Sequence, residues 1–399
     1  MPKILRILNR LNIGGPTLNV TNLSAYLPSN YQTKVLAGFK EEEEGSSEYL
    51  LKDKGINYEY VPGMFRAIQP KNDWKAYQYI KNQINEFKPD IVHTHAAKAG
   101  ALGRLAAHFS KHKPKVIIHT YHGNVFDGYF SPLKSRVFLA IEKYLCSIST
   151  GIIAISEQQK IDLSEKYKIV PAHKIHVIRL GFDLDIFTQN NVEKRNYFRT
   201  FYKIADDEVV VTITGRLAAV KNHRLFINAV KYMKTLDADL KFKVFIVGDG
   251  ELFSDTVYAV EEANLTYCLS NQTNYEAEVI FTSWRKDIDI VNAGSDIIAL
   301  TSINEGTPVS IIEAQASSKA VICTNVGGVK NVVEDGVNGF LCQQNPIEFG
   351  DKLYQLAKNA ALREQFGNEG NKFALKNYGT DRLIEETERL YSDLLKLKE

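Results

Sequence analysis

Short apolar segments alternate with amphipathic stretches along the whole chain. In the first half, apolar runs that predict strands lie at 4–8, 33–37, 57–61, 91–93, 116–120 and 151–155. The second half repeats this pattern at 209–214, 243–247, 278–281, 297–301 and 320–324, with helical segments such as 221–233 and 308–318 between strands. Because strands that alternate with helices form parallel sheets, the pattern predicts α/β architecture with doubly wound sheets.

The second half begins a new sheet rather than extending the first. A polar stretch at 189–207 separates the two series of strands, and the chain of 399 residues is long enough for two hydrophobic cores. We therefore expect one domain over 1–182 and another over 183–380, joined near 180–187.

Composition excludes a membrane-spanning protein and favours anionic partners for the first half. No apolar run approaches the length that crosses a bilayer, and residues 1–12 resemble a buried strand more than a signal peptide. The four cysteines have no paired spacing, so reduced thiols in a cytoplasmic protein are expected. Residues 1–180 carry 25 Lys+Arg and 15 Asp+Glu, whereas 181–399 carry 24 and 32. A basic half suits phosphates, diphosphate-linked lipids or an acidic membrane surface.

The segment 305–314, E-G-T-P-V-S-I-I-E-A, contains the most informative polar pattern. It follows an apolar strand and places Glu305 in the following loop, with Glu313 inside the next helix. Thr307 and Pro308 predict the helix start, as N-cap and first helical residue. Free N–H groups at a helix N-terminus favour phosphate. One carboxylate could then face a polar substrate while the other reaches a sugar hydroxyl.

Further short motifs follow the strand ends in order. They are Gly14-Gly15, His122-Gly123, Gly215-Arg216, Lys221-Asn222 and Gly248-Asp249-Gly250. Together with 305–314 and the following A-S-S-K-A-V-I-C-T-N-V-G-G-V, these residues resemble the signature of the retaining glycosyltransferases of family 4. The resemblance covers nearly the whole chain.

This resemblance implies the GT-B fold, in which two Rossmann-like domains face a central cleft. The first domain would bind the acceptor, the second would bind the nucleotide sugar, and the terminal helix at 381–399 would pack back on the first. The implied activity is transfer of a hexose or N-acetylhexosamine from a nucleotide sugar, with UDP the commonest nucleotide of the family, to a glycan acceptor. The implied setting is surface polysaccharide or glycoconjugate synthesis in bacteria.

The resemblance also implies the roles of individual residues. The expected catalytic residues are His122, Arg216, Lys221 and Glu305. The expected donor-binding residues are Gly14, Gly15, Gly215, Gly248, Arg285, Gly306, Thr307, Pro308, Val309 and Glu313. Arg216 and Lys221 would stabilise the leaving diphosphate, which suits a guanidinium and an ammonium group, and Glu313 would accept hydrogen bonds from the ribose. Pro16-Thr17 and Asn222 depart from the family pattern, and the bulky Trp284 stands where the family has a glycine-containing loop near the base.

No cofactor or metal is expected. The Asp183-x-Asp185 and Asp287-x-Asp289 pairs could suggest a metal site, but the first lies in the expected linker and the second at an expected helix start. His93 and His95 lack a third ligand at suitable spacing. The implied chemistry is electrostatic stabilisation of a departing diphosphate, with the acceptor attacking from the same face.

The acceptor is expected to be linked to a polyprenyl diphosphate. Residues 94–107 resemble a segment of bacterial members that extend such lipids, and the expected acceptor-binding residues are His95, Lys98, Arg104 and Asn124. Aromatic and aliphatic residues lie beside cations, which suits a membrane interface; these are Met64, Phe65, Ile68 and Trp74, and then Phe126, Tyr129 and Phe130. A peripheral enzyme on the cytoplasmic face of the inner membrane is therefore expected, with no nucleic-acid partner.

A degenerate, inactive transferase remains open, although Arg216, Lys221 and Glu313 are intact. Four further functions agree with the sequence to different degrees. A glycosyltransferase with a soluble acceptor differs only in the acceptor, and a GT-B nucleotide-sugar epimerase fits the two glutamates poorly. An exported sugar-binding protein would carry a signal peptide. A nicotinamide enzyme would show G-x-G-x-x-G after the first strand, which residues 14–18 do not.

Overall fold

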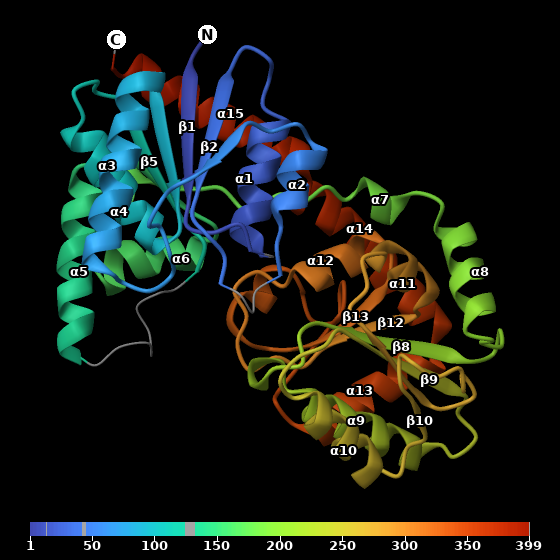
Figure 1. Cartoon of the computed structure of the whole chain (residues 1–399). Helices are drawn as coiled ribbons and strands as arrows, with labels where there is room; N and C mark the ends of the chain where they lie inside the picture. Colours follow the sequence, from blue (N-terminus) through green and yellow to red (C-terminus); the bar gives the residue numbers. More distant parts are fainter. Residues whose placement is uncertain (13, 42–44, 124–131, 399) are drawn as a thin grey trace. The chain divides into compact units, whose positions relative to one another are not determined.

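A computed structural model describes residues 1–12, 14–41, 45–123 and 132–398 of the chain. Contacts divide the chain into two compact units: Met1–Asp183 with Tyr378–Glu399 (unit 1), and Leu184–Asn377 (unit 2). Each unit contains a seven-stranded sheet in which all neighbouring strands are parallel (Figure 1). The boundaries of the units lie close to the predicted ones.

The sheet of unit 1 has the strand order β3-β2-β1-β4-β5-β6-β7. Its strands are β1 Lys3–Leu8, β2 Gln32–Ala37, β3 Tyr58–Tyr60, β4 Ile91–His95, β5 Val116–Tyr121, β6 Gly151–Ala154 and β7 Ile175–Val177. Its helices are α1 Gly15–Ala25, α2 Glu48–Asp53, α3 Pro70–Phe87, α4 Ala97–Phe109, α5 Pro132–Ser147, α6 Glu157–Ile161 and α15 Thr380–Lys396. The direction of strand order reverses between β1 and β4, and ligands of open α/β sheets bind at such a position.

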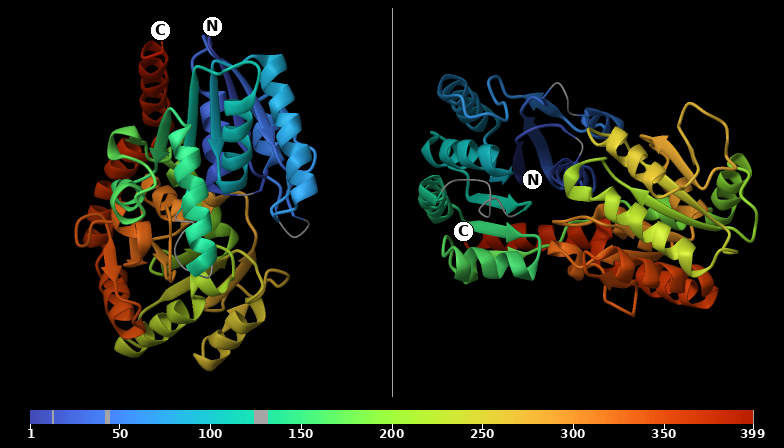
Figure 2. Two further views of the ribbon diagram at one scale, coloured as in Figure 1. Left: turned by 90° about the vertical axis from the view of Figure 1, so that its left-hand side faces the viewer. Right: turned by 90° about the horizontal axis from the view of Figure 1, so that it is seen from below.

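Helices cover both faces of this sheet, because successive residues of a strand point to opposite faces. On one face, Leu5 and Ile7 pack with residues of α3 and α4. On the other face, Ile4 packs with residues of α1 and α15, including Leu390 and Tyr391. The last helix thereby forms part of the core of unit 1, and the two chain ends lie near each other (Figures 1 and 2).

The sheet of unit 2 has the order β10-β11-β9-β8-β12-β13-β14. Its strands are β8 Val209–Thr214, β9 Phe242–Val247, β10 Tyr267–Cys268, β11 Val279–Ser283, β12 Ile297–Leu300, β13 Ala320–Thr324 and β14 Phe340–Cys342. Its helices are α7 Asp185–Thr188, α8 Asn191–Phe201, α9 His223–Leu236, α10 Phe253–Glu262, α11 Ile288–Gly294, α12 Val309–Ala316, α13 Pro346–Lys358 and α14 Ala360–Tyr378. One face of the sheet packs against α9 and α13, and the other against α8 and α11.

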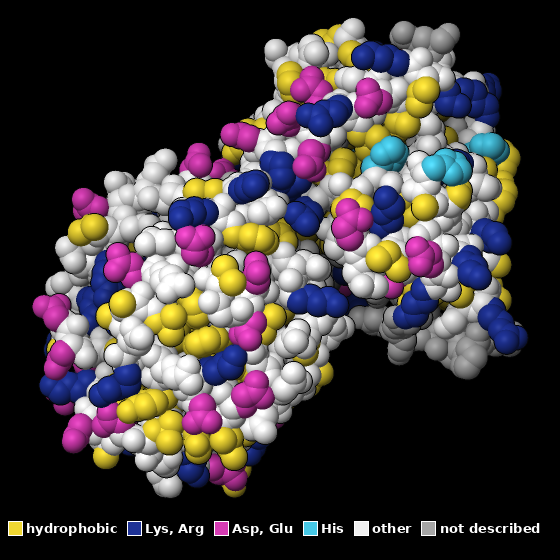
Figure 3. Space-filling view, turned by 180° about the vertical axis from the view of Figure 1, so that it is seen from behind, with side chains coloured by type: hydrophobic (Ala, Val, Ile, Leu, Met, Phe, Trp, Pro, Cys, Tyr) yellow, Lys and Arg dark blue, Asp and Glu magenta, His cyan; other side chains and the backbone are white. Residues whose placement is uncertain are grey.

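The surface mixes charges of both signs with scattered apolar side chains (Figure 3). The histidines visible in that view belong to unit 1, which agrees with eight of the nine histidines lying in the first 180 residues. In the described part of the chain, no helix is long and apolar enough to cross a membrane.

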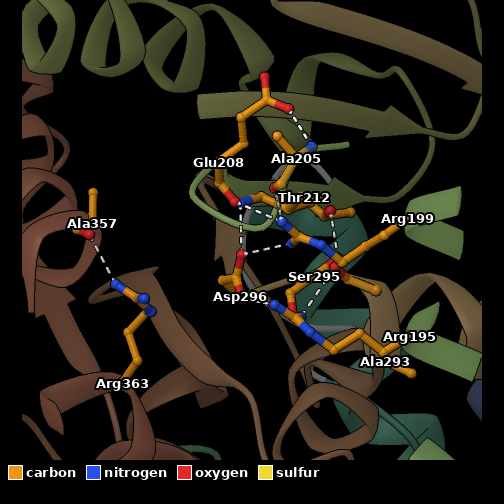
Figure 4. A network of polar contacts seen from close by, with 12 residues as sticks. Arg195, Arg199, Ala205, Glu208, Thr212, Ala293, Ser295, Asp296, Ala357 and Arg363 are labelled. Atoms are coloured by element: carbon orange, nitrogen blue, oxygen red, sulfur yellow. Dashed lines mark hydrogen bonds and ion pairs between the residues drawn. The ribbon is translucent and has the colours of Figure 1, made fainter. Parts of the chain in front are cut away.

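A cluster of cations in unit 2 caps the C-terminal ends of two helices (Figure 4). Arg195 donates to the carbonyls of Gly294, the last residue of α11, and of Ser295, its C-cap. Lys319 donates to the carbonyl of Ala293 at 2.8 Å. Arg363 likewise donates to the carbonyls of Leu356 and Ala357 in α13. Cations at helix C-termini are stabilised by the helix dipole, which gives this cluster a structural function.

Of the cations in this cluster, Lys319 has a lowered pKa and loses its proton most readily. Asp296 already pairs with Arg195 at 2.8 Å and Arg199 at 3.4 Å. Desolvation, followed by the charges of Arg195 and Arg199, lowers the pKa of Lys319 to about 8, and only Asp296 opposes this shift. The unfolded chain keeps the lysine proton up to about pH 10.5. The unfolded state therefore binds more protons between these values, and stability rises with pH in that range.

Lys319→Met is expected to stabilise the protein at pH 7 by about 1 kcal/mol. The variant removes the cost of desolvating the ammonium group, but it also loses the hydrogen bond to Ala293, which offsets part of the gain. The apparent melting midpoint should rise, and the gain should shrink at about pH 10, where Lys319 of the wild type is neutral. Lys376→Met, at an exposed lysine of α14, is the control. A lower midpoint for Lys319→Met would show that the amine stabilises the fold as a cation.

Candidate functional site

An ion pair joins two strand ends of unit 2. Lys221 follows β8, and its Nζ lies 2.6 Å from Oε1 of Glu305, in the loop after β12. Ser302 donates its hydroxyl to the same Oε1 at 2.6 Å, and Thr301 donates to the backbone carbonyl of Lys221 at 3.0 Å. Two predicted catalytic residues, Lys221 and Glu305, are thus in direct contact at the carboxyl edge of the sheet, where parallel α/β sheets bind ligands.

Glycines hold the backbone next to Lys221. A side chain on Gly215 would meet the Lys221 stem at 3.5 Å. Gly248 has a φ of +136°, and a Cβ there would lie 2.0 Å from the carbonyl oxygen of Gly215. The ends of β8 and β9 can therefore approach each other only with glycine at 248. Arg216 is mostly exposed and pairs with Glu251 at 3.0 Å, so the guanidinium is accessible but not held against Lys221.

A second glycine pair supports the loop that carries Glu305. The N–H of Gly328 donates to the carbonyl of Glu305 at 2.8 Å. A Cβ on Gly327 would lie 2.1 Å from that carbonyl oxygen, and one on Gly328 would lie 1.7 Å from the carbonyl oxygen of Gly306. No role was predicted for these two glycines or for Ser302. The signal was present, since G-G-V closes the quoted motif, but glycine pairs more often only turn the chain.

The start of α12 lies one residue later than predicted. The N-cap is Pro308, whose ψ of 85° is not helical, and the helix begins at Val309. The prediction that Thr307 is the N-cap is therefore wrong, and the cap makes no side-chain hydrogen bond. The backbone of Gly306 and Thr307 forms part of the loop beside the ion pair, and a Cβ on Gly306 would meet open space.

Glu313 lies in α12, in the same unit as the ion pair. Its side chain is partly buried, and no hydrogen bond or ion pair joins its carboxyl to another described residue. Desolvation raises the pKa of Glu313 to about 8. A carboxyl group without a protein partner at a partly buried position is suited to hydrogen bonds with a ligand.

Arg285, which was predicted to bind the donor, has partners within unit 2. It donates to Asp287 through Nε at 2.9 Å and to the Tyr202 hydroxyl through Nη1 at 2.9 Å. These contacts anchor the loop after β11. The neighbouring Trp284 is 64% exposed, so it does not fill a gap in the core.

In unit 1, His122 follows β5 and His95 ends β4. Nδ1 of His95 lies 3.0 Å from Nε2 of His122. Among the described residues, Nε2 of His95 and Nδ1 of His122 have no hydrogen-bond partner. Desolvation lowers the pKa of His122 to about 3 and that of His95 well below its usual 6.5, so both rings are neutral at pH 7.

Gly14 and Gly15 lie at the start of α1. Gly14 is the N-cap, and a Cβ on Gly15 would be 3.5 Å from the side chain of Leu180. Thr17, which occupies a position where the family pattern differs, is buried and donates to the carbonyl of Asn12 at 2.8 Å. Thr17 thus stabilises the loop between β1 and α1.

Two of the predicted acceptor-binding residues make internal contacts instead. Arg104 is fully buried, lies 2.8 Å from Glu142 and donates to the carbonyl of Gly100, so the prediction that it binds the acceptor is corrected to a structural role. Lys98 is nearly buried in an ion pair with Asp73 at 2.5 Å, and donates to two carbonyls of the 65–67 loop. Asn124, also predicted to bind the acceptor, lies outside the described residues.

Of the apolar residues predicted to face a membrane, some are buried, some are exposed and some lie outside the described residues. Met64 is fully buried and belongs to the core of unit 1, so that part of the prediction is wrong. Ile68 and Trp74 are 70% and 63% exposed. Phe126, Tyr129 and Phe130 lie outside the described residues. Within the described ranges, no group of three or more His, Cys, Asp or Glu side chains could hold a metal ion.

Two sequence profiles match the chain, one for each half. The profile described as "Glycosyltransferase Family 4" matches residues 13–186, and "Glycosyl transferases group 1" matches residues 194–373. Between them they cover most of the chain.

Individual proteins align over most of the length. The UDP-Gal:alpha-D-GlcNAc-diphosphoundecaprenol alpha-1,3-galactosyltransferase of Escherichia coli is 30% identical over 353 residues, which are 88% of this chain and 86% of that protein. The capsular polysaccharide biosynthesis glycosyltransferase CapM of Staphylococcus aureus is 26% identical over 88% of each chain. The crystal structure of Anabaena HepE in complex with UDP superposes with a TM-score of 0.80 over 98% of this chain and 100% of HepE, at 20% identity. The fold is therefore GT-B.

Proposed function

This chain belongs to the glycosyltransferases of family 4, and we propose that it transfers a hexose or N-acetylhexosamine from a UDP-sugar to a polyprenyl-diphosphate-linked glycan, with retention of the anomeric configuration. The proposal concerns synthesis of a surface polysaccharide or glycoconjugate. The likeness to the galactosyltransferase of Escherichia coli supports the lipid-linked acceptor. The likeness to HepE supports the fold alone.

One observation carries the donor side of the proposal. A cation and a carboxylate, Lys221 and Glu305, meet 2.6 Å apart at the carboxyl edge of a parallel sheet, and the desolvated carboxyl of Glu313 lies in the helix that follows. A nucleoside diphosphate sugar offers a group for each: a diphosphate for Lys221, a sugar for Glu305 and ribose hydroxyls for Glu313. Glu305 occupies one of the three N–H donors of Lys221, so the others can face a diphosphate.

The proposed chemistry relies on charge stabilisation. Departure of UDP places negative charge on the β-phosphate, and Lys221, Arg216 and the N-terminal amides of α12 would stabilise it. Arg216 would leave Glu251 to take part, which its exposed position allows. The acceptor hydroxyl then attacks from the side of the departing phosphate, which accepts its proton. His122, a neutral ring, would donate or accept a hydrogen bond at the sugar.

Thermal stabilisation by a panel of nucleotides tests the donor class. UDP, GDP, ADP and their common hexose conjugates are compared, with EDTA and with Mg²⁺, because we propose that no metal is required. A rise in midpoint with UDP and its sugars, unaffected by EDTA, is the expected result. A rise confined to GDP or ADP would change the donor class, and a shift that needs Mg²⁺ would contradict metal-independent binding.

Glu313→Gln is expected to change how UDP binding depends on pH. We propose that ribose hydroxyls donate to ionised Glu313, whose pKa is about 8 in the free protein, so binding near neutral pH releases a proton. UDP affinity of the wild type should therefore rise relative to the variant by up to about tenfold per pH unit below about pH 8. Calorimetry at several pH values measures this ratio, in which the titration of UDP itself cancels. A ratio independent of pH would reject the ribose contact.

We propose that α5 carries the membrane contact of unit 1. Val137, Ile141 and Tyr144 are 53%, 45% and 47% exposed, and their spacing of four and three residues places them on one face of the helix. Arg136 and Lys143 are exposed as well. The only acidic residue of α5, Glu142, is buried against Arg104, so the described charges on the exposed face are cationic. Apolar groups beside cations favour an anionic bilayer.

Replacing Val137, Ile141 and Tyr144 together with glutamine should weaken binding to phosphatidylglycerol vesicles by about tenfold or more, because each apolar side chain contributes on the order of 1 kcal/mol. Vesicle flotation measures the bound fraction. The matched control replaces Val192, Tyr197 and Phe201 of α8 in unit 2, which are at least as exposed. Equal loss in both variants, or equal binding to phosphatidylcholine, would contradict an anionic-membrane site on α5.

A further inference from the structure

A buried cation, Arg6, lies in the sheet of unit 1 whose strand ends carry His95 and His122. Arg6 lies in the middle of β1 and is fully buried. It donates from Nη1 to the hydroxyl of Tyr391 at 2.7 Å and from Nη2 to the carbonyl of Leu23 at 3.0 Å. Among the described residues no carboxylate pairs with it, which is unusual because a buried charge normally has an ionic partner. The buried charge of Arg6 is therefore held by hydrogen bonds to neutral groups and not by a salt bridge.

Arg6 and Tyr391 fix the protonation of His93. Nδ1 of His93 lies 3.2 Å from Arg6 Nη1 and 2.6 Å from the Tyr391 hydroxyl, and Nε2 lies 2.7 Å from Oγ1 of Thr120. Because an arginine can only donate, Nδ1 of His93 accepts and its proton resides on Nε2, where it is donated to Thr120. Burial raises the pKa of Tyr391 above 10, so its hydroxyl remains a donor. These contacts allow a single arrangement of protons around His93.

The contacts continue from His93 to the end of the sheet. The rings of His93 and His95 lie 4.2 Å apart between centroids and are tilted by 34°. His95 in turn faces His122 through the 3.0 Å contact between Nδ1 and Nε2. Desolvation and then the charge of Arg6 lower the pKa of His93 well below 6.5, and Arg6 also contributes to the lowered pKa of His95. A neutral His95 leaves His122 with one free ring nitrogen, Nδ1, for a ligand.

We propose that Tyr391 of the C-terminal helix is a positioning residue for His122, acting through Arg6, His93 and His95. The helix that contains Tyr391 thereby has a function beyond closing the core of unit 1: the Tyr391 hydroxyl, which bonds Nδ1 of His93, holds that ring in one orientation, and His93 supports His95 against His122. This inference rests on the proposed role of His122 at the donor sugar. It assigns no contact between Tyr391 and substrate.

The test is a double-mutant cycle of Tyr391→Phe and His122→Ala, assayed by transfer from UDP-galactose to GlcNAc-diphosphoundecaprenol. Tyr391→Phe keeps the ring and should lower kcat by about tenfold with little change in KM for the UDP-sugar. If Tyr391 acts through His122, the same change should have little further effect in the His122→Ala background. Tyr31→Phe is the control, since the Tyr31 ring packs beside that of Tyr391 at 6.4 Å and its hydroxyl lies 3.4 Å from Oγ of Ser392, outside the Arg6–His93 contacts.

The outcomes separate this inference from the proposed function. Additive losses in the cycle, or unchanged kcat for Tyr391→Phe beside a large effect of His122→Ala, would overturn the positioning role alone. An inert His122→Ala would reject the role of His122 in the proposed function. Thr120→Val, which removes the partner at Nε2 of His93, should reproduce the loss if Tyr391→Phe is poorly folded.

A second measurement requires no substrate. Long-range 1H–15N spectra of the histidine rings report tautomer and ring environment for each nitrogen. Tyr391→Phe should change the ring signals of His95 and His122, whereas Tyr31→Phe should leave them in place. Unchanged His95 and His122 signals in the Tyr391 variant would contradict the proposed coupling.

Discussion

Lys221→Met is expected to lower turnover by about a hundredfold or more, because it removes the charge closest to the proposed diphosphate site. Methionine keeps the stem that packs against Gly215 while removing the ammonium group. In the free protein, that group is held by Glu305 at 2.6 Å. The variant leaves the Glu305 carboxylate with Ser302 and the Glu305 carbonyl with the Gly328 N–H, so the loop should stay in place. Steady-state transfer, with UDP affinity from calorimetry, separates loss of binding from loss of turnover.

Lys234→Met is the matched control for Lys221. Lys234 also forms an ion pair of 2.6 Å in unit 2, with Glu278, which precedes β11 and so lies at the opposite edge of the sheet. Its loss should leave turnover within about twofold of the wild type, since exposed ion pairs contribute little. Near-normal turnover of the Lys221 variant would exclude a role in stabilising the leaving group.

Gly328→Ala is expected to abolish most transfer, by about a hundredfold or more, although residue 328 has no proposed contact with substrate. The added Cβ would lie 1.7 Å from the carbonyl oxygen of Gly306, and neither backbone can yield without moving the other. The hydrogen bond from the Gly328 N–H to the Glu305 carbonyl would be displaced with it. Displacements of about 1 Å in a catalytic group can cost a factor of about a hundred.

The control for this change is Gly151→Ala in β6 of unit 1. Its Cβ would lie 3.2 Å from Cδ1 of Leu394, the far end of a flexible side chain that can move by a few tenths of an ångström. Both variants should melt within a few degrees of the wild type, while only the Gly328 variant loses transfer and UDP binding. Full activity of a folded Gly328→Ala protein would mean that the Glu305 loop tolerates movement and has no fixed catalytic geometry.

The sequence predicted the elements whose signal is local. The strands at 209–214 and 320–324 were predicted with the bounds that the structure shows, because each is a mostly apolar run that is almost entirely buried. The short strands β7, β10 and β14 were missed, since two or three residues carry no periodicity. The start of α12 was placed one residue early because Thr-Pro matches a common cap, whereas backbone geometry puts Pro308 itself at that position.

In the candidate site too, contacts between residues far apart in the sequence could not be predicted from local patterns. The contact between Lys221 and Glu305 spans 84 residues and was not predicted. The resemblance to a family implied only that both residues belong to the donor site. Arg104 was predicted to meet a ligand because it is a basic residue two turns beyond Lys98 in a segment that resembles members acting on polyprenyl diphosphates. Its partner Glu142 lies 38 residues away and could not be inferred from spacing. The link from Arg6 to Tyr391 spans 385 residues, so only a three-dimensional structure could reveal it.

The central claim is that the chain moves a sugar from UDP to a lipid-linked glycan. Its most direct test supplies the purified protein with GlcNAc-diphosphoundecaprenol and a series of UDP-sugars, and determines the lipid product and its anomeric configuration by NMR. We expect a product with one UDP-sugar, formed with retention and lost in Lys221→Met. A product with inverted configuration, or transfer only to water-soluble acceptors, would contradict it.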